Sequence, residues 1–151
     1  MFRSMLLLGL LLLQAASPAS GQDPTDDPGI RQAALDYIEG WYEGDPVRME
    51  RALHPDLAKR IVVLHPRTGR SLLNHATASM MVEYTRAGGG KETPRDKIQN
   101  EVTVLDVYHN IANVRVVSAD FVDYLHVVKW NGEWRILNVL WEPVERGQAG
   151  E

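Results

Sequence analysis

The sequence contains no cysteine among its 151 residues. This absence excludes disulfide bonds, thiolate metal sites and a lipid-modified cysteine, so stability must come from a packed core. Metal binding by histidine is not indicated either, because no pair of histidines has helical i, i+4 spacing and none belongs to a ligand motif. The five are His54, His65, His75, His109 and His126. The sequence therefore predicts neither a metal site nor a cofactor.

Long apolar runs are scarce, and the one present lies near the amino terminus. Arg3 precedes the run Leu6–Leu13, and the small residues of Ala15–Gly21 follow it. This order is typical of a cleaved signal peptide over residues 1–20, with cleavage near Ala19–Gly21. The run is shorter than the roughly 20 residues needed to span a bilayer. We expect a periplasmic or secreted protein without a stable membrane anchor; an uncleaved anchor is the alternative.

A concentrated positive charge is also missing. The chain has 16 Lys and Arg against 20 Asp and Glu, mixed along its length, and a net charge of −4. Nucleic acid is therefore not an expected partner, because phosphate binding needs a basic surface. After the signal we expect a flexible lead over residues 21–29, one domain over 30–143 and a disordered tail over 144–151. About 130 residues suffice for one domain with an ordinary core.

The local patterns predict helices first and a series of strands afterwards. A first helix begins with Asp27 as its N-cap and Pro28 at its first position, and Gly44 ends it. Asp45 caps a second helix, and Asn74 caps a third. The further expected ranges are helices Val47–Leu53 and Asn74–Arg86 and strands Leu57–Leu64, Ile98–Tyr108 and Ile111–Ser118. This order is typical of an α+β fold with the helices on one face of an antiparallel sheet.

The stretch Phe121–Trp141 gives the clearest pattern, a hairpin closed by Asn131-Gly132. With a two-residue turn, Trp130 faces Glu133, and unbroken pairing continues to Val122 and Trp141. One face then holds Phe121, Asp123, Leu125, Val127, Lys129, Trp134, Ile136, Asn138 and Leu140. The other holds Val122, Tyr124, His126, Val128, Trp130, Glu133, Arg135, Leu137, Val139 and Trp141. Both faces are largely apolar, so we expect both to be covered.

Three segments together resemble a known superfamily. They are AALDYIEGWYEGDPVRMERALHPDLAKR, VLDVYHNIANVRV and DYLHVVKWNGEWRILNVLWEP. In order and type they resemble the nuclear transport factor 2-like superfamily, and within it the group named for lumazine binding. That group is similar to SnoaL-like polyketide cyclases and ketosteroid isomerases. The resemblance implies a cone-shaped α+β fold, in which a bent antiparallel sheet wraps around amino-terminal helices beside a pocket. It also implies a homodimer formed through the sheet's outer face.

Asp123 is the first candidate for a functional role. In the unbroken register Asn138 is its diagonal neighbour on a face rich in apolar residues. Burial there would raise the pKa of a carboxyl and suit it to proton transfer. The alternative is a structural carboxylate satisfied by hydrogen bonds. The aromatic residues Tyr37, Trp41 and Tyr84 belong either to the core or to the wall of a ligand pocket.

These candidates leave three hypotheses open. The first is a domain that binds a small apolar or aromatic molecule, with Tyr37, Trp41, Tyr84, Asp123 and Asn138 as ligand-binding residues. The second is an isomerase, cyclase or dehydratase that uses Asp123 as general base. The third is a dimeric interaction module with a vestigial pocket. Its interface residues would be Tyr124, His126, Leu137, Val139 and Trp141.

Overall fold

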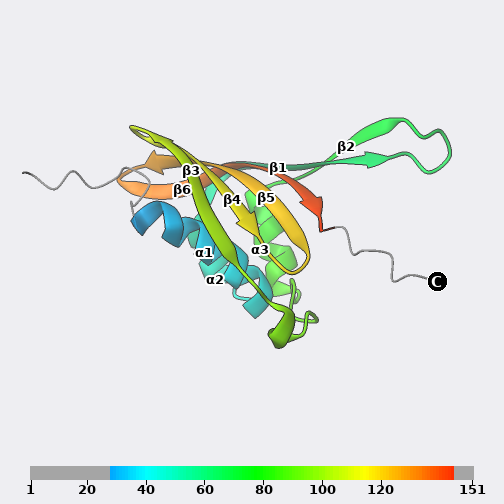
Figure 1. The fold of residues 1–151 in the computed structure, drawn as a ribbon, viewed down its shortest axis with the longest axis horizontal. Helices are drawn as coiled ribbons and strands as arrows, with labels where there is room; N and C mark the ends of the chain where they lie inside the picture. Colours follow the sequence, from blue (N-terminus) through cyan, green and yellow to red (C-terminus); the bar gives the residue numbers. More distant parts are fainter. Residues whose placement is uncertain (1–27, 145–151) are drawn as a thin grey trace, which may run out of the picture.

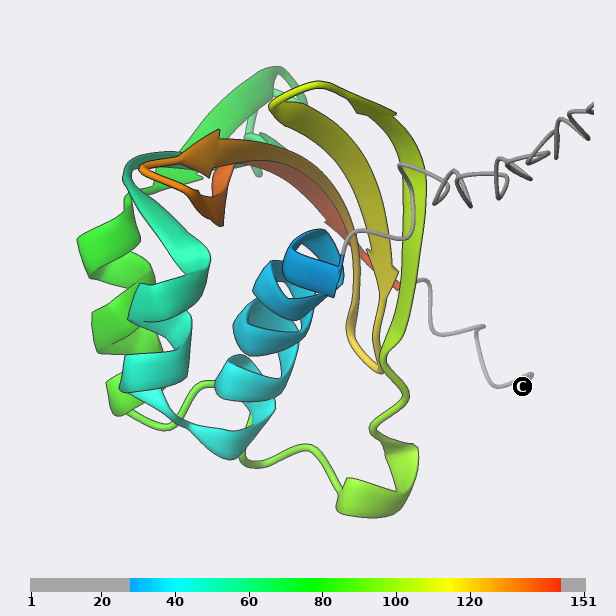
Figure 2. The ribbon, with the colours of Figure 1, turned by 90° about the vertical axis from the view of Figure 1, so that its left-hand side faces the viewer.

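The computed structural model describes residues 28–144, which form an open six-stranded sheet with helices packed on one face (Figures 1 and 2). The helices are α1 (Pro28–Glu43), α2 (Pro46–Ala52), α3 (Ala78–Arg86) and the short 3-10 helix η2 (Arg95–Lys97). The strands are β1 (Leu53–Leu64), β2 (Ser71–Ala76), β3 (Glu101–Tyr108), β4 (Ile111–Val117), β5 (Phe121–Trp130) and β6 (Glu133–Pro143). The expected α+β class is confirmed.

The sheet has the strand order β2-β1-β6-β5-β4-β3. Its neighbouring strands pair antiparallel except β1 and β6, which run parallel, so the sheet is mixed. Figure 2 shows strands β3 to β6 arching over α1, with α2 and α3 beside it. At the other edge, β1 and β2 extend beyond the helices as a two-stranded arm (Figure 1). The curved part of the sheet and the helices enclose the core.

The starts of the first two helices follow the sequence signals. α1 begins at Pro28, and the expected cap Asp27 lies outside the described residues. The side chain of Asp45 accepts hydrogen bonds from the backbone N–H groups of Val47 and Arg48, as expected of an N-cap at α2. Asp36 then ties the two helices together, accepting hydrogen bonds from Arg48 at 3.2 Å and from Arg51 at 2.7 Å. The bend between the helices is therefore held by side chains as well as by the cap.

Asp36 is almost completely buried, and its charge is held by these contacts. Burial alone would raise the pKa of its carboxyl, but hydrogen bonds from Arg51, Gln32 and Arg48 outweigh burial and lower the pKa below its ordinary value. Asp36 is therefore a structural carboxylate rather than a candidate for proton transfer.

The segment before α3 differs from the expectation. The predicted cap at Asn74 is wrong, because the cap is Thr77, whose side chain accepts from the N–H of Met80. Asn74 and His75 lie instead in β2, paired with Ile61 and Arg60 of β1. The sequence did not predict this strand. In β2 the backbone N–H and C=O groups form their hydrogen bonds with β1, whereas in a helix they would bond within the segment itself. Pairing with a distant strand therefore overrides the local helix-cap signal at Asn74.

The register of the last hairpin contains a bulge that the sequence did not predict. Trp130 faces Glu133 and Val127 faces Ile136 as expected, but His126 faces Asn138 and Asp123 faces Trp141. Leu137 is the extra residue in β6. A bulge places two residues against one and bends its strand, so every residue of β6 after Leu137 is on the face opposite to the one predicted.

The consequences of this bulge correct several predicted positions. Val139 and Trp141 lie on the inner face with Leu125 and Asp123, whereas Asn138 and Leu140 lie on the outer face. Burial agrees, because Val139 is 2% exposed and Leu140 is 57% exposed. The predicted Asp123–Asn138 contact and the outward positions of Val139 and Trp141 are therefore wrong.

A second bulge occurs in the hairpin of β3 and β4. Val107 faces Ala112, so unbroken pairing would place Leu105 opposite Val114, but Val104 faces Val114 instead. Leu105 is the extra residue, and it is exposed while Val104 is buried. In the β4–β5 pairing Asn113 faces His126, so the two bulges lie about one residue pair apart across the sheet. Bulges that lie nearly in line bend neighbouring strands together, which suits a sheet that curves around α1.

The core lies between α1 and the inner face of the sheet. Ile30, Ala34 and Ile38 from α1 pack with inner-face residues that include Val114, Leu125 and Ile136. None of the helices within residues 28–144 is long and apolar enough to cross a membrane.

Candidate functional site

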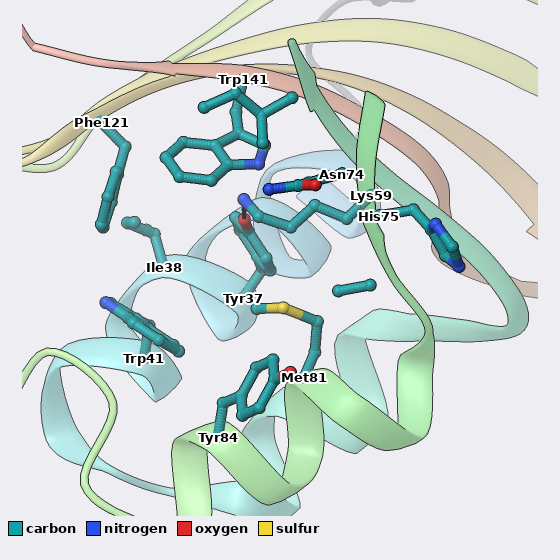
Figure 3. A pocket seen from close by; sticks show the side chains of 12 residues that line it. Tyr37, Ile38, Trp41, Lys59, Asn74, His75, Met81, Tyr84, Phe121 and Trp141 are labelled. Carbon is teal, nitrogen blue, oxygen red and sulfur yellow. Dashed lines mark hydrogen bonds between the residues drawn. The ribbon is translucent and has the colours of Figure 1, made fainter. Parts of the chain in front are cut away.

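A cavity of about 240 Å³ lies between α1, α3 and the part of the sheet built from β1, β2, β5 and β6 (Figure 3). Its walls are mainly apolar and aromatic. The lining residues are Tyr37, Ile38, Trp41, Lys59, Ile61, Asn74, His75, Ala76, Met81, Tyr84, Phe121 and Trp141. The polar atoms drawn in Figure 3 belong to Tyr37, Lys59, Asn74, His75 and Tyr84 and to the indole rings of Trp41 and Trp141. A concave apolar site with a few placed polar groups is the usual form of a small-molecule pocket.

Three side chains from three elements meet at the polar corner of this cavity. Lys59 Nζ donates to the Tyr37 hydroxyl at 2.6 Å and to Asp123 Oδ1 at 2.8 Å. The Tyr37 hydroxyl donates to the same Asp123 oxygen at 3.0 Å. We call Tyr37, Lys59 and Asp123 the polar triad. α1 supplies the tyrosine, β1 the lysine and β5 the aspartate, so the triad ties the helix to both halves of the sheet.

The triad is buried, and burial sets its electrostatics. Asp123 is 0% exposed and Lys59 is 9% exposed. Desolvation lowers the pKa of the Lys59 ammonium, and the charge and hydrogen bond of Asp123 only partly oppose this lowering. The pKa of the Tyr37 hydroxyl is raised well above its ordinary value, first by burial and then by the negative charge of Asp123. Tyr37 therefore remains a neutral hydrogen-bonding group.

Aromatic rings enclose the lysine head group. Its Nζ lies 4.6 Å from the centroid of the Trp141 ring and 5.3 Å from that of Tyr37. Such distances allow cation–π attraction, which partly replaces the hydration lost on burial. Trp141 in turn packs edge-on against Phe121, with ring centroids 5.1 Å apart. The lysine is thus held by one carboxylate, one hydroxyl and aromatic faces.

Trp41 is held in place by a glycine turn after α3. The Trp41 carbonyl accepts a hydrogen bond from the N–H of Gly90 at 3.0 Å. A Cβ atom at Gly90 would lie 2.8 Å from Nε1 of Trp41, too close for any other residue without a shift. The glycine run that ends α3 therefore lets the backbone approach Trp41 and fixes one wall of the cavity.

The structure brings together four of the five residues suggested as ligand-binding. Tyr37, Trp41 and Tyr84 line the cavity, and Asp123 is buried beside it in the polar triad. Asn138 is on the opposite face of the sheet, where it meets His126 at 3.5 Å. The physical reason is the bulge at Leu137, which turns Asn138 outward and Trp141 inward.

Sequence reasoning missed Lys59. It lies between Leu57 and Ile61 in β1, two residues from each. Side chains two residues apart in a strand share a face, and these three lie on the inner face, where Leu57 is buried and Ile61 lines the cavity. A lysine flanked at i−2 and i+2 by large apolar residues in a strand is a signal that could have identified a buried amine. Asn74 was missed because β2 itself was missed.

The geometry bears on the possible role of Asp123 in proton transfer. Its Oδ1 already accepts from Lys59 and Tyr37. Its Oδ2 is buried without a hydrogen-bond partner within the described part of the chain, and Asp123 is not among the residues that line the cavity. Lys59 and Tyr37, its two neighbours in the polar triad, both line the cavity. The site can therefore offer a ligand aromatic contact, one hydrogen-bond donor and an amine.

Comparison with known protein families shows to which family the chain belongs. The sequence model of the family described as "Putative lumazine-binding" matches residues 25–142. The chain belongs to this family. The match spans the helices, all six strands and every member of the polar triad. The resemblance inferred from the sequence segments is thus confirmed for the lumazine-binding family. None of the curated proteins compared with the chain matches it.

Solved structures show the same fold. An NTF2-like (nuclear transport factor 2-like) protein of unknown function from Methylobacillus flagellatus has 20% identity and a TM-score of 0.62, covering 82% of this chain and 95% of its own. One from Silicibacter pomeroyi has 19% identity and a TM-score of 0.61, with coverages of 81% and 99%. A ketosteroid isomerase-like protein from Erwinia carotovora atroseptica has 12% identity and a TM-score of 0.51, with coverages of 78% and 95%. At these identities the likeness shows the nuclear transport factor 2-like fold alone.

Proposed function

We propose that the chain is an exported domain that binds a small apolar or aromatic molecule in the cavity between α1, α3 and the sheet. The observation that carries the proposal is the combination of aromatic walls with one polar corner at Tyr37 and Lys59. The family's description agrees with such a role, since lumazine is a small planar molecule. No catalytic activity is part of this proposal.

The size of the cavity supports a ligand of one or two rings. Its volume is about 240 Å³, whereas an engineered apolar cavity of roughly 150 Å³ in another protein is large enough to bind benzene. Apolar contact with Trp41, Phe121 and Trp141 would supply most of the affinity, because burial of aromatic area is the largest favourable contribution. The Lys59 ammonium would orient a carbonyl or other acceptor on the ligand.

Filling the cavity should weaken binding. Ala76 lines the cavity from β2, so Ala76→Phe should occupy the ligand's space and weaken binding by about tenfold or more, equivalent to roughly 1.4 kcal/mol. Isothermal titration calorimetry with lumazine and with indole as probes measures the change. The matched control is Ala58→Phe, since Ala58 pairs with Asn138 on the outer face and should bind as the wild type does. Unchanged binding by Ala76→Phe would place the ligand elsewhere.

The enzyme hypothesis with Asp123 as general base finds less support. A base must reach the proton that it removes, but the hydrogen-bonded oxygen of Asp123 is engaged by Lys59 and Tyr37. The isomerase, cyclase or dehydratase alternative therefore has Asp123 in a position better suited to holding Lys59 than to contacting a substrate.

We also propose that the chain forms a homodimer through the outer face of the sheet. The set of interface residues differs from the one predicted, because the bulge at Leu137 changes which residues of β6 face outward. Tyr124, Leu140 and Ile111 are large, apolar and exposed there. Tyr124 pairs with Leu140 across β5 and β6. His126 and Asn138 lie beside them, together with Leu137. Val139 and Trp141, which were predicted for this interface, face inward.

Leu140→Glu should therefore give a monomer. A carboxylate at the centre of a two-fold interface lies against the same carboxylate of the other copy or against apolar surface. The interface also excludes the water that would solvate its charge, so the dimer is destabilised. Sedimentation velocity should show wild-type dimer and variant monomer, while Glu142→Gln, at an exposed outer site on the same strand, should remain dimeric. A monomeric wild type would refute the interface.

Export forms part of the proposal on the basis of residues 1–20, which lie outside the described residues. Amino-terminal sequencing of the protein recovered from culture should find a start near Ala19–Gly21. Recovery of chains that still begin at Met1 would favour an uncleaved segment instead.

A further inference from the structure

Lys59 is placed unusually for a lysine, because its amine lies in the cavity rather than in solvent. Figure 3 shows its Nζ between the Tyr37 hydroxyl and the Trp141 ring. The measured contacts agree, at 2.6 Å to the hydroxyl and 4.6 Å to the ring centroid. Lysine is seldom buried unless paired, and its placement costs stability. A buried amine at the wall of an apolar cavity is the arrangement used by lysines that form Schiff bases.

We propose that Lys59 condenses reversibly with the carbonyl group of an aromatic aldehyde or ketone bound in the cavity and forms an imine. The inference rests on the proposed function, because it requires a ligand in the same cavity. It goes further by naming the chemical class of the ligand and the atom that holds it.

The reaction balances without any oxidant or reductant. The lone pair of neutral Nζ attacks the carbonyl carbon, a C–N bond forms, and the electron pair of the C=O double bond moves to oxygen. After proton transfer the oxygen leaves as water while the nitrogen lone pair closes the C=N bond, and the nitrogen loses a proton. One amine and one carbonyl thus give one imine and one water. The apolar walls limit the access of water that would reverse the reaction.

The polar triad supplies a path for the protons. Lys59 donates to both Tyr37 and Asp123, and Tyr37 donates to Asp123. The hydrogen bond from Lys59 Nζ to Asp123 Oδ1 gives a direct route for the proton that the ammonium must lose. Burial favours that loss, because desolvation penalises the charged ammonium. The Tyr37 hydroxyl stands beside Nζ and can donate to the carbonyl oxygen as it develops charge.

Titratable groups from four elements either contact Lys59 or line the same cavity. Asp123 of β5 and Tyr37 of α1 contact it directly. His75 of β2 and Tyr84 of α3 are the remaining titratable side chains that line the cavity. Burial is the largest cause that lowers the pKa of Lys59, and Asp123 opposes it. A neutral amine is therefore more accessible here than at a solvated lysine.

The chain contains its own controls for a trapping experiment. Its other lysines are Lys91, Lys97 and Lys129, and all three are exposed. Full-length protein at neutral pH would be incubated with benzaldehyde and sodium cyanoborohydride, which reduces an imine to a stable secondary amine. Peptide mapping by mass spectrometry then gives the extent of benzylation at each lysine. Benzyl alcohol, which lacks the carbonyl, serves as a competitor for the cavity.

We expect benzylation of Lys59 to exceed that of each exposed lysine several-fold, because the cavity holds the aldehyde beside its amine and burial favours the neutral form of that amine. Benzyl alcohol should reduce labelling at Lys59 only, and Lys59→Arg should lower total labelling to that of the exposed lysines. Labelling of Lys59 equal to or below that of the other lysines would overturn the imine. If indole still binds in that case, the cavity keeps its proposed function; if neither indole nor lumazine binds, both proposals fall.

Discussion

Val139→Glu should lower the free energy of unfolding by several kcal/mol, whereas Leu140→Glu should leave the stability of the chain almost unchanged. Val139 is 2% exposed on the inner face, so a glutamate there is a buried charge without a partner. Such a charge costs several kcal/mol, roughly 3–5 or more, against a total stability of about 5–15 kcal/mol for a typical domain. Leu140 is exposed, and exposed substitutions usually change stability by about 0.5 kcal/mol or less.

The comparison tests the bulge at Leu137 directly. Without the bulge the faces of Val139 and Leu140 are exchanged, and the two variants should behave in the reverse order. Thermal unfolding followed by circular dichroism, at protein concentrations low enough for both variants to be monomeric, separates the alternatives. An unchanged melting temperature in Val139→Glu, together with a large decrease in Leu140→Glu, would contradict the register described above.

Asp123→Asn should lower the free energy of unfolding by about 3–5 kcal/mol at neutral pH, because it leaves the buried Lys59 ammonium without its counter-charge. Equilibrium unfolding in urea measures the loss. Asp123→Leu combined with Lys59→Met should recover most of it, since an apolar pair can replace a buried ion pair at little cost. A catalytic carboxylate without a structural role would instead tolerate Asp123→Asn with little change in stability.

The same variant should show a characteristic dependence on pH. The pKa of Lys59 in the folded protein is lower than in the unfolded chain, so the unfolded chain binds more protons between the two values, and stability rises with pH through that interval. Asp123 opposes the lowering, so its removal lowers the pKa of Lys59 further and widens the interval. The stability difference between wild type and Asp123→Asn should therefore narrow as pH rises toward 10.5, the ordinary lysine value. A difference that is constant or grows would exclude Lys59 as its cause.

Much of the fold could be predicted from local sequence. Proline, asparagine, aspartate and glycine have strong conformational preferences, and these signals placed the start of α2 at Asp45 and the hairpin turn at Asn131-Gly132. Asn131 and Gly132 both adopt positive φ, at 51° and 86°, as this type of turn requires. The periodicity of α1 likewise placed Tyr37 on its buried face.

The site was predicted less well, because the bulges leave little local signal. Leu105 and Leu137 are ordinary strand residues, and what favours a bulge there is the curvature of the sheet around α1, a property of the assembled fold. One unrecognised residue in β6 was enough to turn Asn138 away from Asp123 and to place Trp141 opposite it. The arrangement of the polar triad also depends on β1 lying parallel to β6, where Lys59 pairs with Val139. No local pattern specifies that contact between distant segments.

The central claim is that the cavity beside the polar triad, and no other surface, holds the ligand. Titration of isotope-labelled protein with indole, followed by amide chemical shifts in nuclear magnetic resonance spectra, tests it most directly. We expect the largest shifts at cavity residues such as Tyr37, Lys59 and Trp141. The outer face has a hollow of its own, lined by residues that include His126 and Asn138. Shifts concentrated at those two residues, with none around Lys59, would contradict the account.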